Sequence, residues 1–151
     1  MVYLNIEKGV IKINRDCGDI IDRLTIAELK TKRIGTEENF KEFHAFEKAF
    51  VEEIKTQYPQ FPWDSIKTLM LSINDSIWQL ESGLKSGKEE LKNPVYLLDE
   101  DNKEVLSKIG LTTILIRNFN NLRIQFKNLI NILTKTGFID VKKNHLSEKG
   151  D

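Results

Sequence analysis

The stretch that decides the fold runs from Gly18 to Ile34 and reads GDIIDRLTIAELKTKRI. Its apolar residues recur at helical spacing and share one broad face, which is typical of an amphipathic helix that packs against a core. These residues are Ile20, Ile21, Leu24, Ala27 and Ile34. Gly35 is expected to end this helix. Glu28 falls at the margin of the apolar face, where a carboxylate needs a partner if helices meet there.

Length and composition limit the class of protein. The chain has 151 residues, of which 40% are hydrophobic and 30% are charged, so we expect one globular domain. No apolar run approaches the roughly 18 residues of a membrane span. The start, MVYLNIEKG, lacks a secretory pattern, so we expect a cytoplasmic protein without a membrane partner. A single cysteine, Cys17, excludes an internal disulfide, and with only two histidines it cannot form a Cys/His zinc site.

The charges are balanced overall but unevenly distributed. Acidic and basic residues number 23 each, which argues against a nucleic-acid partner. No acid occurs between Val105 and Ile139, whereas the segment from Glu37 to Glu53 is rich in glutamate. This pattern predicts two complementary helices within one bundle or one oligomer, and a basic groove for an anionic ligand is the alternative.

Further segments show helical or strand patterns. Residues 1–14 alternate in β-branched and aromatic side chains, which predicts a β-hairpin with a tight turn. Thr36 is expected to cap a second helix, and Pro62 to lie in the first turn of a third. Asp101 is expected to cap a long last helix that runs toward Gly137.

Each of these three helices carries apolar residues that we expect to face the core. In the second helix they are Phe40, Phe43, Phe46, Phe50 and Ile54. In the third they are Ile66, Leu69, Ile73, Ile77, Leu80 and Leu84. In the last they are Leu111, Leu115, Leu122, Phe126, Leu129 and Leu133. The predicted fold is an all-α antiparallel bundle of about four helices with a short N-terminal β-hairpin. It forms one domain over residues 1–140, followed by a polar tail at 141–151 that we expect to be mobile.

Polar side chains lie at the edges of three of the apolar faces. Glu28 has this place on the first helix, Glu81 on the third and Arg123 on the last. Because a partly buried carboxylate is costly unless it is paired, we expect Glu28 or Glu81 to meet Arg123 or Lys127. One interpretation is a structural ion-pair network that fixes the register of the helices.

A second interpretation is a pocket for a carboxylate or a phosphate, since arginine offers a planar bidentate donor and asparagine adds further donors. Its candidate ligand-binding residues are Arg123, Lys127, Asn120, Asn131, Asn74, Trp78, Glu28 and Glu81. A third interpretation is a magnesium site formed by Asp22, Glu28 and Glu81, because a hard cation prefers oxygen ligands.

The motifs of common enzymes are missing from the sequence. It contains no GxGxxG pattern, no Walker loop and no G-x-S-x-G elbow. Cys17 lies at a helix start without a histidine partner, so a structural role is favoured. No residue is assigned a catalytic role.

Three blocks of the sequence resemble an uncharacterised bacterial family, a domain of unknown function. Its first block is similar to G-E-x-x-D-K-x-T-I-L-E-x-K and is matched here by Gly18, Asp19, Asp22, Arg23, Thr25, Ile26, Glu28 and Lys30. Its second, similar to N-x-x-L-W-x-I-E-D-x-I-R, is matched by Asn74, Ile77, Trp78, Leu80, Glu81 and Leu84. Its third, similar to N-D-x-R-x-x-x-K-x-x-I-N, is matched by Asn120, Arg123, Lys127, Ile130 and Asn131.

The chain departs from the family pattern at Ala27, Ser82, Lys85 and Asn121. The family usually has acids where Ser82 and Asn121 stand, so their loss favours binding over catalysis. The resemblance implies a bacterial or phage origin and proximity to surface-glycan biosynthesis genes, and it implies no known reaction.

The function expected from the sequence is that of a non-enzymatic helical binding or interaction protein. It would hold an anionic small molecule, such as a nucleotide or a sugar phosphate, in a polar seam between helices. One form of this function is a sponge that sequesters a nucleotide signal. One alternative is a metal-dependent enzyme that acts on a nucleotide or a sugar phosphate with Mg²⁺. The other is a purely structural subunit of a homo-oligomer. The expected partner is a second copy of the chain, and no cofactor is expected outside the enzyme alternative.

Overall fold

The described part of the protein consists almost entirely of helices. The computed structural model describes residues 2–6, 9–13, 16–85 and 100–137. The α-helices in these residues are α1 (Cys17–Arg33), α2 (Glu37–Ala49), α3 (Trp63–Lys85) and α4 (Glu100–Thr134). A π-helical segment, η1 (Phe50–Lys55), continues α2. The predicted all-α bundle is confirmed. Within the described residues, no helix is both long enough and apolar enough to cross a membrane.

Two short strands precede the helices. Strand β1 (Val2–Ile6) pairs antiparallel with β2 (Gly9–Ile13), with Val2 opposite Ile13 and Ile6 opposite Gly9. The turn between them, at residues 7–8, lies outside the described residues, so the hairpin over 1–14 stays a prediction. The tail predicted at 141–151 also lies outside them.

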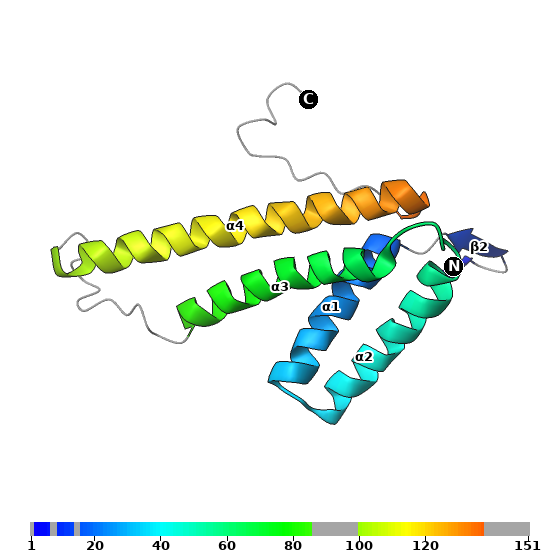
Figure 1. The fold of residues 1–151 in the computed structure, drawn as a ribbon, viewed down its shortest axis with the longest axis horizontal. Helices are drawn as coiled ribbons and strands as arrows, with labels where there is room; N and C mark the ends of the chain where they lie inside the picture. The colour runs from blue at the N-terminus through cyan, green and yellow to red at the C-terminus, as the bar shows by residue number, and fades with distance from the viewer. Residues whose placement is uncertain (1, 7–8, 14–15, 86–99, 138–151) are drawn as a thin grey trace, which may run out of the picture.

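The helices are arranged as two antiparallel pairs, α1 with α2 and α3 with α4, and α1 joins the two pairs. Figure 1 shows α3 and α4 side by side in opposite directions, and α1 and α2 as a hairpin that extends away from them. Helix α1 contacts α2, α3 and α4, and its start lies against the end of α4. The later turns of α1 lead away from α4 (Figure 1). Only the first turns of α1 therefore meet α4.

The stretch that includes α1 folds largely as its periodicity predicts. Ile21 and Leu24 are fully buried, and they belong to the core cluster with Phe50, Ile54 and Trp63. Ile34 is the exception, because it is the C-terminal cap of the helix and is 58% exposed. Gly35 follows with a positive φ of 75°, and its N–H bonds to the Lys30 carbonyl oxygen. Thr36 caps α2 by accepting from the Asn39 N–H at 3.2 Å, as predicted.

The phenylalanine face of α2 is buried toward its end. Phe50 and Ile54 are buried, and Phe43 and Phe46 pack partly against the core. Phe40 was also expected to face the core, and this was wrong because it lies in the exposed first turn of the helix. The core therefore fills against the end of the α2–η1 segment.

Helix α4 buries a different face from the one predicted. It passes Gly110 without a break, and Phe126 packs against the core as expected. The other residues expected to point inward are exposed: Leu111, Leu115, Leu122, Leu129 and Leu133. In α3, Leu69 is likewise exposed. The prediction was wrong for the α4 leucines because α4 is apolar on both faces, and contacts with the start of α1 decide which face is covered.

Candidate functional site

The first turn of α1 is held by the end of α4. The Gly18 N–H donates to Asn131 Oδ1 at 2.8 Å, and the Cys17 N–H donates to Thr136 Oγ1 at 3.1 Å. Asp16 is the N-cap residue and accepts from the Asp19 N–H at 2.8 Å. These bonds satisfy amides that a helix start leaves without partners inside the helix. The two ends are therefore locked together by buried hydrogen bonds between residues more than 110 positions apart.

Gly18 allows the close approach of these two helices. A Cβ atom at this position would lie 2.6 Å from the Lys127 carbonyl oxygen and 3.0 Å from Asn131 Oδ1. The nearest of these atoms belongs to the backbone and cannot rotate away. Residue 18 must therefore be glycine for α1 and α4 to pack at this distance.

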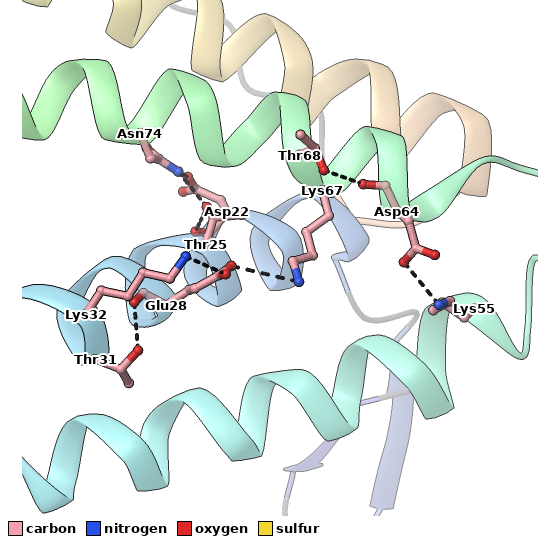
Figure 2. Close-up of polar contacts among 10 residues, drawn as sticks. All are labelled: Asp22, Thr25, Glu28, Thr31, Lys32, Lys55, Asp64, Lys67, Thr68 and Asn74. Carbon is pink, nitrogen blue, oxygen red and sulfur yellow. Dashed lines mark hydrogen bonds and ion pairs between the residues drawn. The ribbon is translucent and has the colours of Figure 1, made fainter. Parts of the chain in front are cut away.

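A buried hydrogen-bonded group joins α1 to α3. Asn74 Nδ2 donates to Asp22 Oδ1 at 2.9 Å and to Thr25 Oγ1 at 2.8 Å (Figure 2). The Thr25 hydroxyl donates in turn to the Asp22 carbonyl oxygen at 2.8 Å. All three residues are buried. Because buried polar groups are stable only when they are hydrogen-bonded, this group fixes α3 against α1 at one position.

Lys127 connects the same carboxylate to α4. Its Nζ lies 3.9 Å from Asp22 Oδ2 and 3.7 Å from Asp19 Oδ1. The side chain of Lys127 is only 16% exposed, so its charge is screened less than that of a surface lysine. We call Asp22, Thr25, Asn74, Lys127 and Asn131 the polar seam.

The partner predicted for Glu28 is wrong. Glu28 Oε1 pairs with Lys32 Nζ at 3.1 Å, and Oε2 lies 3.8 Å from Lys67 Nζ on α3 (Figure 2). The physical reason is the direction of α1, because Glu28 belongs to the later turns of this helix, and these lead away from α4 (Figure 1). The acids of α1 that reach α4 are Asp19 and Asp22, which precede Glu28 by about two and a half turns and about one and a half turns.

The remaining predicted site residues do not gather at one place. Glu81 is exposed, and the Asn120 side chain donates at 3.1 Å to the Ile116 carbonyl oxygen of its own helix. The Arg33 guanidinium lies 5.4 Å from the ring centroid of Trp78. Arg123 differs from all of these, since its Nε is buried and has no hydrogen-bond partner in the described part of the chain. The structure thus brings three of the predicted ligand-binding residues, Asn74, Lys127 and Asn131, into the polar seam, and it leaves the other predicted ligand-binding residues outside it.

The pKa values of the Cys17 thiol and the Asp75 carboxyl differ from their ordinary values. Burial raises the pKa of the Cys17 thiol, so the thiol stays protonated at neutral pH. Arg33 donates a hydrogen bond to Asp75, and this bond lowers the pKa of the Asp75 carboxyl. Neither group belongs to the polar seam.

Sequence reasoning missed several residues that fasten the helices. Asp16, Gly18 and Thr136 were given no role, although two of them carry a recognisable signal. An aspartate three residues before Asp19 is typical of an N-cap, and a glycine inside a helical pattern often marks a close approach. Thr136 lies beyond the last helix and had no comparable signal.

The three acids suggested for magnesium lie in separate surroundings. Asp22 bonds to Asn74 and faces Lys127, Glu28 pairs with two lysines, and Glu81 is exposed. Across residues 16–84 and 103–137, no group of three or more histidine, cysteine, aspartate or glutamate side chains could hold a metal ion. The arrangement therefore provides no convergent set of oxygen ligands in that part of the chain.

The chain was also compared with known proteins. No family model, no curated protein and no solved structure matches it.

Proposed function

We propose that this protein is a non-enzymatic helical interaction protein, an assembly subunit that binds a second copy of itself through the outer face of α4. The observation that supports the proposal is the spacing of exposed residues along that helix. They follow one another at alternating steps of four and three, and we call them the α4 stripe: Leu111, Leu115, Asn118, Leu122, Gln125, Leu129 and Ile132. All seven are exposed.

Alternating steps of four and three give a period of 3.5 residues, which is the period of a coiled-coil seam. Five of the seven stripe residues are leucine or isoleucine, and none is charged. Leu111 is 63% exposed and Leu122 is 45% exposed, so both are accessible to a partner. Large exposed apolar patches on a monomer mark interaction sites, and five apolar stripe residues lie along one side of this helix.

A second copy of α4 fits this surface because it supplies the same repeat over the same length. The stripe spans about 30 Å, or three heptads, at 1.5 Å per residue. Because the α4 stripe carries no charge, its partner does not need to carry the opposite charge. Covering a half-exposed leucine contributes about 1 kcal/mol, and association costs roughly 4 kcal/mol or more. We therefore expect a dissociation constant in the range of tens of micromolar to millimolar.

Sedimentation equilibrium from about 10 to 500 µM protein tests the proposal over that affinity range. We expect a monomer–dimer equilibrium that is lost when Leu115→Glu and Leu122→Glu are combined, because each copy would bury two charges in the interface between the two α4 helices. Val51→Glu is the matched control, since Val51 is similarly exposed at 48% but lies in η1. A folded wild-type chain that stays monomeric throughout, or a dimer that both sets of substitutions leave unchanged, would refute the proposal.

Binding of an anionic small molecule is a second candidate, and it is favoured by the buried Nε of Arg123, which has no hydrogen-bond partner among the described residues. This atom lies within the acid-free segment of the chain. A nucleotide or sugar phosphate that binds there should raise the melting temperature of the wild type but not that of Arg123→Met. If neither protein responds to a panel of such ligands, this candidate is eliminated.

We also propose that the protein is cytoplasmic, that residues 1–14 form a β-hairpin and that the chain is related to the uncharacterised bacterial family that it resembles. The metal-dependent alternative gains no support, because the described Asp22, Glu28 and Glu81 do not converge.

A further inference from the structure

Resting on the proposed function, we infer that the two copies pair α4 with α4 in parallel and in register. In this arrangement Asn118 and Gln125 each lie opposite their own copies. The inference names the orientation of the partner and the two residues that select it.

The stripe contains two heptad positions with different chemistry. One position holds only leucine, at Leu115, Leu122 and Leu129. The other holds Leu111, Asn118, Gln125 and Ile132, so the two amides fall at the same heptad position. This difference between the two positions makes the orientation of the partner matter.

A parallel pair in register sets every stripe residue against itself. Leucines then meet leucines, and Asn118 meets the partner's Asn118. An amide side chain has both a donor and an acceptor, so two identical amides can bond to each other. A single buried asparagine layer is known to fix the register and the number of strands of a coiled coil.

An antiparallel pair sets one heptad position against the other. Asn118 would then face a leucine such as Leu122, and Gln125 would face Leu115 or Leu122. Each amide would lose water without gaining a hydrogen-bond partner, which is unfavourable. Shifting a parallel pair by one heptad would place Asn118 against Leu111 and shorten the overlap. The in-register parallel pair is therefore the arrangement that satisfies both amides.

The rest of the fold leaves room for this pairing. Lys127, Ile130 and Asn131 are turned toward α1 or buried on the inner face of α4, opposite the exposed stripe. Helix α4 also lies at the edge of the bundle, with α3 and α1 on one side of it (Figure 1). A two-fold axis along the outer face would place the two bundles on opposite sides of the α4 pair.

Single cysteines at the two ends of the stripe test the orientation by disulfide formation. Leu111→Cys, Leu129→Cys and Ile132→Cys are made separately, and the wild type, whose only cysteine is the buried Cys17, is the control. A parallel pair predicts that each variant cross-links to itself. Mixing Leu111→Cys with Ile132→Cys should give little cross-linking between them, because their positions lie about 30 Å apart along the helix.

The opposite pattern identifies an antiparallel dimer. If Leu111→Cys cross-links only when it is mixed with Ile132→Cys or Leu129→Cys, the orientation is overturned and the proposed self-association stands. If the chain is monomeric by sedimentation and the Leu111→Cys thiol is also protected from a thiol reagent, another segment of the chain covers the stripe. That result overturns both the orientation and the proposed function.

Asn118→Leu provides a second measurement that does not depend on cross-linking. Removing the buried amide should tighten the dimer by about tenfold or more, because such a residue gives specificity at a cost in stability. The Leu111→Cys variant should then also lose its strict preference for self-cross-linking when it is combined with Asn118→Leu. A dimer that is weakened by Asn118→Leu, or left unchanged, would show that residue 118 does not lie in the interface between the two α4 helices.

Discussion

Replacing Gly18 by alanine measures how closely α1 and α4 must approach. The added Cβ would lie 2.6 Å from the Lys127 carbonyl oxygen, so the two helices must separate. Overpacking of this kind costs about 1–3 kcal/mol. Separation also strains the buried bond from the Gly18 N–H to Asn131, which is worth about 1 kcal/mol. Alanine regains about 0.5–1 kcal/mol through its higher helix propensity. We expect a net loss of about 1–3 kcal/mol in the free energy of unfolding.

Urea unfolding followed by circular dichroism, at one protein concentration for all variants, provides the assay. Gly110→Ala in α4 is the matched control, since a Cβ atom there would have nothing within 4 Å. That substitution should stabilise the protein by about 0.5–1 kcal/mol. The two substitutions must therefore shift the unfolding midpoint in opposite directions. If Gly18→Ala proves as stable as Gly110→Ala, the contact with Lys127 does not limit the packing, and the account of this interface fails.

Two further predictions concern side-chain contacts. Asn74→Ala removes the donor to Asp22 and Thr25, so urea unfolding should show a loss of about 2–3 kcal/mol. Asn120→Ala is the control and should change the free energy of unfolding by less than about 0.5 kcal/mol, because the described hydrogen bond of that amide lies within its own helix. If Asn74→Ala and Asn120→Ala lose equal amounts of stability, the role of Asn74 is refuted. Arg33 lowers the pKa of the Asp75 carboxyl in the folded state. Ionised Asp75 therefore stabilises the folded protein at a pH above the pKa that Asp75 has in the unfolded chain. This contribution is lost as the pH falls through the pKa of Asp75 in the folded protein. Asp75→Asn should therefore be less stable than the wild type at neutral pH, and the difference should shrink as the pH falls through the lowered pKa of Asp75. A difference that did not change with pH would count against the pair.

The helices and the core face of α1 could be predicted because both depend on local spacing. Ile21 and Leu24 are buried as expected, and Thr36 caps α2 as expected. The signals for these features lie within a few residues of one another, so no knowledge of the tertiary fold is needed. Ile34 was expected to be buried because its spacing fits the apolar face of the helix. It is exposed because it is the cap residue directly after the last turn, and spacing alone does not locate the end of a helix to one residue.

The polar seam and the inner face of α4 depend on contacts that periodicity cannot provide. Helix α4 has apolar residues all round, so spacing alone does not say which face is covered. The choice follows from Asn131 and Lys127, which bond to the first turns of α1. The prediction that a basic residue of α4 would meet an acid of α1 had the right kind of pair but the wrong carboxylate. Choosing Asp22 instead of Glu28 requires knowing where α1 crosses α4, which is a property of the assembled fold.

The division of α4 into two faces makes folding and assembly separable. On the inner face, Gly18, Asn131 and Lys127 fix α1 by close approach, hydrogen bonds and charge, so the bundle forms without burying the leucines of the α4 stripe. Those leucines remain available for a partner, because no contact of the described monomer covers them. Substitutions in the stripe should therefore change the association constant with little effect on the unfolding of the monomer. Substitutions at Gly18 or Asn74 should weaken both, since a stripe can be presented to a partner only by a helix that α1 and α3 hold in place.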